Sequence, residues 1–422
     1  MARETRGPVG EGEGADDEAS AAGLVLPGGK VDAEAVRRAV EKAEELGLDD
    51  DSALRTVVFH IRRDLGKRLD KYLTDRIGFL SRNQLQRLID EGGVRVNDRA
   101  PKASTKIGAG DVVEVVIPAP PPSNIQPEDI PLDVLFEDEH IIVLNKQPDI
   151  IVHPARSHLK GTLLSALTYH FLHRSKAGGG LSAVGEEFAR PGVVHRLDRH
   201  TSGCIAFAKT EEAHWKLAHH FEHRRVDKRY LAIAHGAIEP DVQVIELPIG
   251  PHPSREKGYR EKYVVRHDEL GKHAVTIARV RERYEVPAAS GVEKFSLVEL
   301  ELKTGRTHQI RVHLSYNQWP IVGDDMYAGK GVGLRDGVLE LFAAGDHETP
   351  EGVRAILRRQ ALHACTLGFR HPVTEAPMEF TAPLRGDIGR LVHVLRGGKT
   401  TGVDAPGATV DLAKAVPERD AM

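Results

Sequence analysis

The chain has 422 residues, more than one hydrophobic core usually organises, so we expect two or more folding units. Its 40% hydrophobic and 28% charged residues are typical of a globular protein, and no apolar run approaches the roughly 18 residues of a membrane helix. The N-terminus lacks the apolar stretch of a signal peptide, and its acidity argues against a transit peptide, so we expect a cytoplasmic protein without a membrane partner. Cys204 and Cys365 are too few for a disulfide framework or a thiolate zinc site, and we expect both to be buried.

The net charge of −4 seems to discourage an RNA partner, but the charge is unevenly distributed. Residues 1–60 hold 7 Lys/Arg against 14 Asp/Glu, a net of −7, whereas residues 61–118 hold 12 against 8, a net of +4. The acidity is therefore local, and the segment that follows it is basic.

The N-terminal segment has almost nothing to bury. Residues 1–29 are rich in Gly, Ala, Glu and Asp, which is typical of disorder, and Val31 to Leu46 could form an acidic helix. We therefore expect residues 1–58 to be an acidic, largely disordered extension with one helix.

A small α/β module is expected over residues 59–117. Leu69, Tyr72, Leu73 and Ile77 lie at helical spacing, so one helix is predicted around them. A second helix begins at a capping box at Ser81 and ends at Gly92-Gly93, and strands are predicted at Val94 to Asn97 and at Val112 to Ile117.

Two short helices with basic outer faces, then a tight turn and strands, resemble the RNA-binding domain named after ribosomal protein S-four. The resemblance implies that basic side chains line up against phosphates, namely Arg68, Lys71, Arg82, Arg87 and Arg95. On charge alone, an ordinary solvated helix face is the better explanation of these residues, because surface charge is common. The turn and the helix-stop glycines favour the RNA-binding interpretation.

A proline-rich linker is expected over residues 118–130, followed by a long mixed region over residues 131–394. Strand patterns occur at His140 to Leu144, Cys204 to Ala208, Tyr230 to His235 and Leu297 to Leu302, and helical patterns at Leu163 to Leu172 and Glu211 to His223. The fold class is therefore α+β. The segment from Gly329 to Thr349 is expected to be a loop insertion, and residues 395–422 a disordered tail.

One polar segment, His195 to Gly203, follows a short predicted strand at Val193 to His195 and precedes the strand at Cys204. Asp198 is thus predicted on a loop between two strands, where catalytic carboxylates often lie. Two other interpretations stay open: Asp198 could cap the turn, or His195, Asp198 and His200 could bind a metal, which is the weaker idea.

A second cluster runs from Thr304 to His313. Thr304-Gly305 ends a strand, and Ile310, Val312 and Leu314 then alternate as if another strand begins, which places Arg306 at the turn. An arginine near a catalytic aspartate keeps the carboxylate ionised and orients it. Taken alone, the segment is better explained by an arginine in a surface hairpin.

These clusters, together with Asn145-Lys146, Val152-His153-Pro154 and Lys228-Arg229-Tyr230, resemble pseudouridine synthases of the RluA/RluD type from about Pro131 to Leu384. The resemblance implies a mixed, mostly antiparallel sheet with flanking helices and a central cleft. It also implies that Asp198 is the catalytic aspartate, Arg306 its pairing arginine and Tyr230 the tyrosine that packs against the target base. Other residues of the same motifs are expected to bind RNA or uridine: Lys146, His195, Arg196, Ile310 and Arg311.

Two positions depart from the family pattern Lys-Pro-x-Gly. Here the loop is Lys146-Gln147-Pro148-Asp149, which moves the proline and loses the glycine. Neither change removes a reacting group.

The implied reaction converts uridine to pseudouridine in structured RNA without a cofactor or a metal, and we expect a monomer. Large-subunit ribosomal RNA is the expected substrate, and transfer RNA is the alternative. Two other classes stay open: a non-catalytic RNA-binding or ribosome assembly protein, and a nucleoside glycosidase that uses Asp198 with water.

Overall fold

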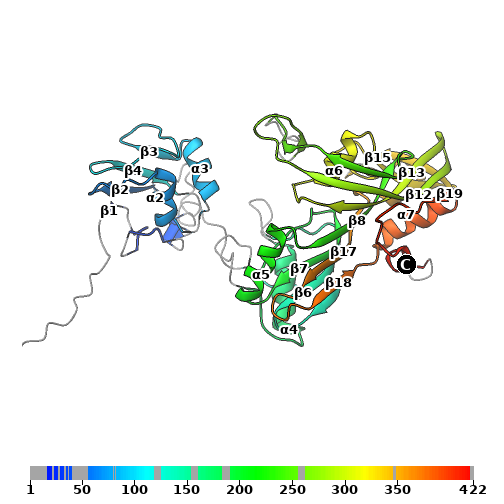
Figure 1. The fold of residues 1–422 in the computed structure, drawn as a ribbon, viewed down its shortest axis with the longest axis horizontal. Coiled ribbons are helices and arrows are strands. Elements are labelled where there is room, and N and C mark those ends of the chain that lie inside the picture. Colours follow the sequence, from blue (N-terminus) through cyan, green and yellow to red (C-terminus); the bar gives the residue numbers. More distant parts are fainter. Residues whose placement is uncertain are drawn as a thin grey trace, which may run out of the picture. The chain divides into compact units, whose positions relative to one another are not determined.

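A computed structural model describes residues 17–20, 23–26, 29–32, 35–36, 38–39, 56–78, 80, 82–117, 125–153, 160–182, 191–254, 262–345 and 348–418. The described residues form two compact units, one ending at residue 117 and one beginning at residue 125. Figure 1 shows both units, and each is described by itself.

The small unit is a four-stranded sheet in the order β1-β2-β4-β3 with two helices. Its elements are β1 (Asp17–Ser20), β2 (Thr56–Ile61), α2 (Leu69–Arg76), α3 (Arg82–Asp90), β3 (Val94–Val96) and β4 (Val112–Val116). Asn97 and Asp98 have φ of 50° and 59°, as a tight hairpin turn requires. Both predicted helices and both strands of this module are therefore confirmed, although the Ser81 cap lies outside the described residues.

The N-terminal extension contributes to this unit, contrary to expectation. β1 pairs antiparallel with β2, and Leu24, Val31, Ala35 and Val36 are buried in the same core cluster as Phe59 and Tyr72. The domain also begins at Thr56 rather than at residue 59. Four apolar residues in a Gly-rich, acidic segment are enough to cover an existing core, because that core supplies most of the buried surface. Most of the predicted helix at Val31 to Leu46 lies outside the described residues.

The large unit is built on a mixed sheet of 13 strands, in the order β16-β14-β15-β12-β13-β8-β17-β7-β6-β5, with β18 beside β17 and with β9 and β19 beside β12 (Figure 1). The strands are β5 (Val134–Glu137), β6 (Ile141–Lys146), β7 (Ser202–Ala208), β8 (Asp227–His235), β9 (Val242–Glu246), β12 (Val275–Ala288), β13 (Gly291–Leu302), β14 (Lys330–Arg335), β15 (Val338–Ala343), β16 (Arg354–Leu357), β17 (Leu362–Arg370), β18 (Pro377–Thr381) and β19 (Lys399–Gly402). β10 (Ile249–Pro251) and β11 (Tyr263–Val265) form a separate pair. Among the described strands, only β7 with β17 and one bridge between β12 and β15 are parallel. The predicted α+β fold with a mostly antiparallel sheet is confirmed.

The helices of this unit are α4 (Leu163–His173), α5 (Glu211–Glu222), α6 (Gln309–Tyr316), α7 (Gly386–Arg396) and α8 (Leu412–Ala415). α4 and α5 cover opposite faces of β6 and β7. Ile142 and Leu144 share a core cluster with α4, whereas Ile141 and Val143 share one with α5. Successive side chains of a strand point to opposite faces, and both faces of β6 are covered, so β6 is buried along its whole length.

Strand register gathers distant sequence motifs into one row across the sheet. Leu300 lies opposite Tyr230, Tyr230 opposite Ala364, Ala364 opposite Gly203, and Gly203 opposite Lys146. Gly203 has φ of 114°, and a Cβ there would lie 2.2 Å from the Ala364 carbonyl oxygen. Only glycine fits this close approach, so the final glycine of the His195 to Gly203 segment is fixed by sheet packing.

Three predictions about the large unit are wrong. Residues 125–130 belong to the large unit rather than to a linker, since Ile125 and Ile130 pack on its core. The predicted loop insertion from Gly329 contains the paired strands β14 and β15. The tail after residue 394 is ordered through residue 418: β19 pairs with β12, and the buried Glu299 accepts hydrogen bonds from the backbone of Thr409 and Val410.

Across the described residues, no helix is long and apolar enough to cross a membrane. Cys204 and Cys365 are both free and buried, as expected.

Candidate active site

The loop that carries Asp198 runs from a single bridge between Val193 and Phe207 to the start of β7, so the predicted strand at Val193 to His195 is only that bridge. His195 supports the loop: its Nε2 accepts the backbone N–H of Ala206 at 2.9 Å, and its ring stacks on Phe221 at 4.3 Å. Desolvation lowers the pKa of His195 to about 3, so the ring is neutral.

Lys146 holds the same loop from β6. Its Nζ donates to the carbonyl oxygens of Arg199 at 2.9 Å and Thr201 at 2.8 Å, and to that of Gln147 at 3.0 Å. Lys146 is fully buried and does not line the cavity, so the expectation that it contacts RNA or uridine is wrong in this structure. Burial lowers the pKa of Lys146 to about 7, while its three carbonyl partners match the three hydrogens of an ammonium group.

Arg359, just before β17, holds the carbonyl of His200, which lies between Arg199 and Thr201 in the chain. Its Nη1 donates to the His200 carbonyl at 2.8 Å, and its guanidinium is fixed by two bonds to Asp387, at 2.7 and 2.8 Å. Three successive carbonyls after Asp198 are thus held by two buried basic side chains. These bonds come from β6 and from the segment that leads into β17, so the loop is held by elements that are themselves fixed in the fold.

The arginine that meets Asp198 is Arg311. Its Nη1 lies 3.2 Å from Asp198 Oδ2, while Nε and Nη2 make a paired contact with Asp324 at 2.8 and 2.9 Å. Arg311 is 5% exposed and Asp324 fully buried. Burial alone would lower the pKa of Arg311, but the hydrogen bonds and charge of Asp324, helped by the charge of Asp198, raise it. Asp324 therefore keeps a buried cation charged and aims its free edge at Asp198.

Arg306, predicted for this role, does not pair with Asp198. Its Nε donates to the His273 carbonyl at 3.1 Å, at the edge of the same cavity. The error comes from the segment that follows, which forms α6 rather than the predicted strand. Gln309 to Leu314 are all buried, and within α6 only Tyr316, its last residue, is exposed, so the apparent alternation hid an almost fully buried helix. In a helix, Arg311 points inward. In a strand, Arg311 and Ile310 would have pointed to opposite faces.

His308 also faces Asp198, with Nε2 3.8 Å from Oδ2. The Tyr327 hydroxyl accepts the backbone N–H of Tyr263 at 2.9 Å and lies 2.9 Å from His308 Nδ1, to which it can donate. Desolvation lowers the pKa of His308, so a neutral ring held this way presents its Nε2 hydrogen to Asp198.

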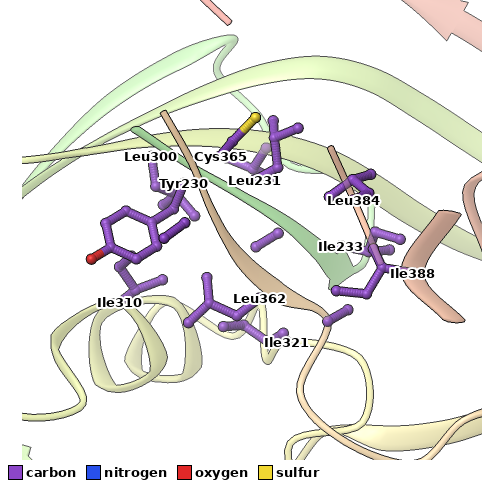
Figure 2. Packing of buried hydrophobic residues seen from close by; sticks show 14 of the residues in the cluster. Tyr230, Leu231, Ile233, Leu300, Ile310, Ile321, Leu362, Cys365, Leu384 and Ile388 are labelled. Atoms are coloured by element: carbon purple, nitrogen blue, oxygen red, sulfur yellow. The ribbon is translucent and has the colours of Figure 1, made fainter. Parts of the chain in front are cut away.

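Tyr230 and Ile310 form one wall of the site. Figure 2 shows the Tyr230 ring beside Ile310, with its hydroxyl directed away from the apolar cluster that contains Leu231 and Ile233. Tyr230 is 8% exposed, and no described residue is hydrogen-bonded to its hydroxyl. Burial raises the pKa of Tyr230, so this hydroxyl is protonated at neutral pH.

The cavity has a volume of about 990 Å³. Of the predicted site residues, it is lined by Asp198, Tyr230, His195, Arg196, Arg306, Ile310 and Arg311. Arg196 is exposed at its edge, where Nη2 donates to Thr307 at 3.0 Å. An aromatic wall, an ionised carboxylate and surrounding cations in a cavity of this size suit one extruded nucleotide.

In the small unit, the fully buried Asp70 gathers two of the predicted RNA-binding side chains. Arg68 donates to it at 3.1 and 3.0 Å, and Arg82 at 3.1 and 2.8 Å. Lys71 and Arg87 are exposed on α2 and α3, but neither side chain bonds to Asp70. Arg95 is exposed on β3, so the structure joins two of the five predicted residues into one cluster.

Sequence reasoning missed the roles of Asp324, His308 and Arg359. His308 lies in the Thr304 to His313 cluster, and Asp324 and Arg359 lie in the stretch from Pro131 to Leu384 that resembles the family. Their roles were missed because a buried ion pair depends on contacts that spacing does not show. Asp149, which stands where the family has glycine, has φ of 62°, a left-handed conformation that glycine adopts freely. Its carboxylate lies 2.6 Å from Nδ1 of His200, so the departure adds a contact to the Asp198 loop.

Among the described residues, no group of three His, Cys, Asp or Glu side chains is arranged to hold a metal ion. Of the three residues considered for a metal site, His195 and His200 contact Ala206 and Asp149 instead of a shared centre with Asp198.

Comparison with known proteins agrees with this site. Residues 140–316 match the family model of RNA pseudouridylate synthase, and residues 67–113 match that of the S4 domain. An "Uncharacterized RNA pseudouridine synthase YlyB" of Bacillus subtilis is 38% identical over 78% of this chain and 94% of its own. "Ribosomal large subunit pseudouridine synthase D" of Zymomonas mobilis is 37% identical over 78% of this chain and 94% of its own.

The same name is carried by a protein of Xanthomonas campestris that is 36% identical over 82% of this chain and 94% of its own. The relatives thus span both units, and almost all of each relative is matched. The chain therefore belongs to the RluA/RluD-type RNA pseudouridine synthases, isomerases of RNA uridine, and carries an N-terminal S4 RNA-binding domain.

Proposed function

We propose that this enzyme isomerises uridines of large-subunit ribosomal RNA, with Asp198 as its catalytic carboxylate. One observation carries the assignment of Asp198: its carboxylate lies in the cavity, 3.2 Å from a guanidinium that is itself anchored by the buried Asp324. The side chain of Asp198 is 28% exposed, and no described residue is hydrogen-bonded to its Oδ1. That oxygen is available to the nucleotide.

The reaction breaks the bond between ribose C1′ and uracil N1, rotates the base and joins C1′ to C5. The C5 hydrogen leaves as a proton and N1 gains one, so atoms and electrons balance without any co-reactant. An ionised carboxylate can attack C1′, add to the base or remove a ribose proton. Each route needs a charged Asp198 in a shielded site, which the contact with Arg311 supplies.

Tyr230, which lines the same cavity as Asp198, supports the same proposal. Its ring offers a face for the uracil, and its hydroxyl, protonated and without a partner among the described residues, can bond to the base. Tyr230→Phe keeps the ring and removes only this bond. We expect RNA affinity within a few-fold of wild type and a rate about 10²-fold lower in single-turnover assays, the usual effect of losing one active-site hydrogen bond.

The ribosomal substrate rests on the relatives that bear the name ribosomal large subunit pseudouridine synthase D and match nearly their full length to this chain. Mapping pseudouridine across total RNA from cells with and without the gene tests it. Sites lost only from large-subunit ribosomal RNA are expected, and losses only in transfer RNA would contradict the ribosomal assignment.

The chemistry is tested with ribosomal RNA labelled with tritium at uridine C5. Wild type is expected to release tritium while no free uracil forms, and Asp198→Asn to be slower by about 10³-fold or more. Free uracil in the supernatant would instead indicate a glycosidase. Equal tritium release by Asp198→Asn and wild type would exclude Asp198 as the catalytic group, and no release by wild type on any cellular RNA would indicate a non-catalytic RNA-binding protein.

A further inference from the structure

Helix α5 has one buried face and one exposed face. Thr210 caps it by accepting the backbone N–H of Ala213, and Ala213, His214 and Leu217 are buried against the sheet. The opposite face carries Trp215, which is 63% exposed. This amphipathic pattern explains the buried side but not the large apolar ring on the other.

The exposed face carries a row of flat rings. Trp215, His219 and His223 follow at positions i, i+4 and i+8, which lie above one another on a helix, and all three are exposed. The rings of His219 and His223 stack at 3.9 Å. Among the described rings, Trp215 contacts only that of His214, in a T-shaped arrangement at 5.8 Å, and no described ring is stacked on its indole, which is 63% exposed.

The row ends at His223, whose neighbours in the chain line the active-site cavity. Phe221, Glu222, Arg224 and Arg225, at the C-terminal end of α5 and just beyond it, all line that cavity. Arg224 and Arg225 are exposed, and no described acidic side chain pairs with either. Of the acidic residues on α5, only Glu222 lies close to Arg224 and Arg225 in the chain. Glu212 is paired with Lys216 at 2.8 Å, and Glu211 lies at the far end of the helix.

A single exposed aromatic residue is common on protein surfaces. Here, however, the ring lies in a row of three whose last member, His223, is flanked in the chain by residues that line the cavity. Two of these, Arg224 and Arg225, are exposed cations. Single-stranded RNA is recognised by bases that stack on flat side chains and by phosphates that contact arginine. The negative charge of Glu222 does not prevent stacking, because an RNA base is uncharged.

We propose that the exposed face of α5 is a stacking platform for the unpaired nucleotides next to the target uridine. Their bases lie on Trp215 and on the His219–His223 pair, and their phosphates contact Arg224 and Arg225. This inference rests on the proposed function, since it places the target uridine in the adjoining cavity.

Tryptophan fluorescence tests the platform directly, because the chain holds only Trp215 and Trp319. The full-length enzyme is titrated with a hairpin RNA that has uridines in its loop, and binding is followed separately by a label on the RNA. Emission is expected to be quenched as RNA binds, and Trp215→Phe to remove that change while keeping affinity within about threefold, since phenylalanine still stacks.

Trp215→Ala should weaken binding by about 5- to 100-fold, the range for loss of one stacked base. The penalty should vanish when the loop nucleotides beside one uridine are abasic, which keeps the phosphates but removes the bases. Tyr316→Ala is the matched control: Tyr316 is 55% exposed on α6, does not line the cavity and should bind as wild type. Circular dichroism of each variant verifies folding.

Unchanged Trp215 emission at saturating RNA, or Trp215→Ala with wild-type affinity, would overturn the platform and leave this face to a protein partner. Tritium release by wild type, measured in parallel, separates this failure from failure of the proposed function. Release without any effect of Trp215→Ala refutes the platform alone, whereas quenching without release refutes the proposed activity alone.

Discussion

In the small unit a fully buried aspartate holds two arginines at the surface, whereas in the large unit a fully buried aspartate holds one arginine inside a cavity. Asp70 accepts from Arg68 and Arg82, whose side chains are 42% and 49% exposed. Asp324 accepts from Arg311, whose side chain is 5% exposed. The same acidic anchor thus serves two different purposes.

The difference lies in what the arginine can still reach. The outer edges of Arg68 and Arg82 face water, so they can meet any phosphate, and salt screens that attraction. The free edge of Arg311 faces only Asp198, in a site where screening is weak. A fixed cation at the surface favours general RNA affinity, and a fixed cation in a cavity favours one defined carboxylate.

The largest effect in this comparison is expected from Asp324→Asn. The change leaves Arg311 buried with one charged partner fewer, so we expect tritium release to be about 10²- to 10³-fold slower and the free energy of unfolding to fall by about 3–5 kcal/mol. Single-turnover tritium release and urea unfolding measure the two effects. The neighbouring Asp325→Asn, at an exposed position, is the control, and a wild-type rate for Asp324→Asn would refute the anchoring role.

A smaller effect is expected from Arg311→Lys, which keeps the charge but loses the planar fork that spans Asp324 and Asp198. The rate should fall about 10- to 100-fold, because lysine cannot make both contacts in that geometry. Arg306→Lys, at the edge of the same cavity, should stay within about threefold of wild type. A larger loss of rate in Arg306→Lys than in Arg311→Lys would indicate that Arg306 is the pairing arginine.

Asp70→Asn tests the surface anchor. Without the carboxylate, Arg68 and Arg82 lose their fixed positions, so RNA affinity should fall about 3- to 10-fold, roughly the value of one or two charge-assisted hydrogen bonds at a partly exposed site. The rate at saturating RNA should not change, since Asp70 belongs to the other unit. A changed saturating rate with unchanged affinity would contradict this division of roles.

The smallest effect is a pH dependence of stability. The side-chain hydrogen bond from Arg68 leads the causes that hold the pKa of Asp70 below its ordinary value, although burial opposes it. Its ionised form therefore stabilises the fold at pH values above that ordinary value of about 4, and this stabilisation is lost as the pH falls below it. The difference in urea midpoint between wild type and Asp70→Asn should shrink from pH 6 to pH 3, and a constant difference would argue against the ion pairs.

Long periodic elements were predictable from local pattern. The helices at Leu163 and Glu211 and the strands around β6, β7, β8 and β13 lie close to their predicted positions. Each has a clear buried face or is buried throughout, so the pattern and the packing agree.

Elements whose stability comes from elsewhere were missed. The four residues of β19 are all exposed, and this strand is held by backbone pairing with β12, which leaves no apolar signature. In α6, Gln309 to Leu314 are all buried, so this stretch has no exposed polar face that would mark a helix. In both cases the neighbouring strands, rather than the local residues, decide the conformation.

The sequence by itself determined the family, the chemistry and the loop that carries Asp198, because motif order and residue type are local properties of the chain. Tertiary structure alone decided that Arg311 rather than Arg306 faces Asp198, and that Lys146 supports the loop from behind. The physical reason is that both outcomes depend on contacts across the fold. The strand register that aligns Lys146, Gly203 and Tyr230 joins residues far apart in the chain, and a charge buried there is stable only beside the partners that this register supplies.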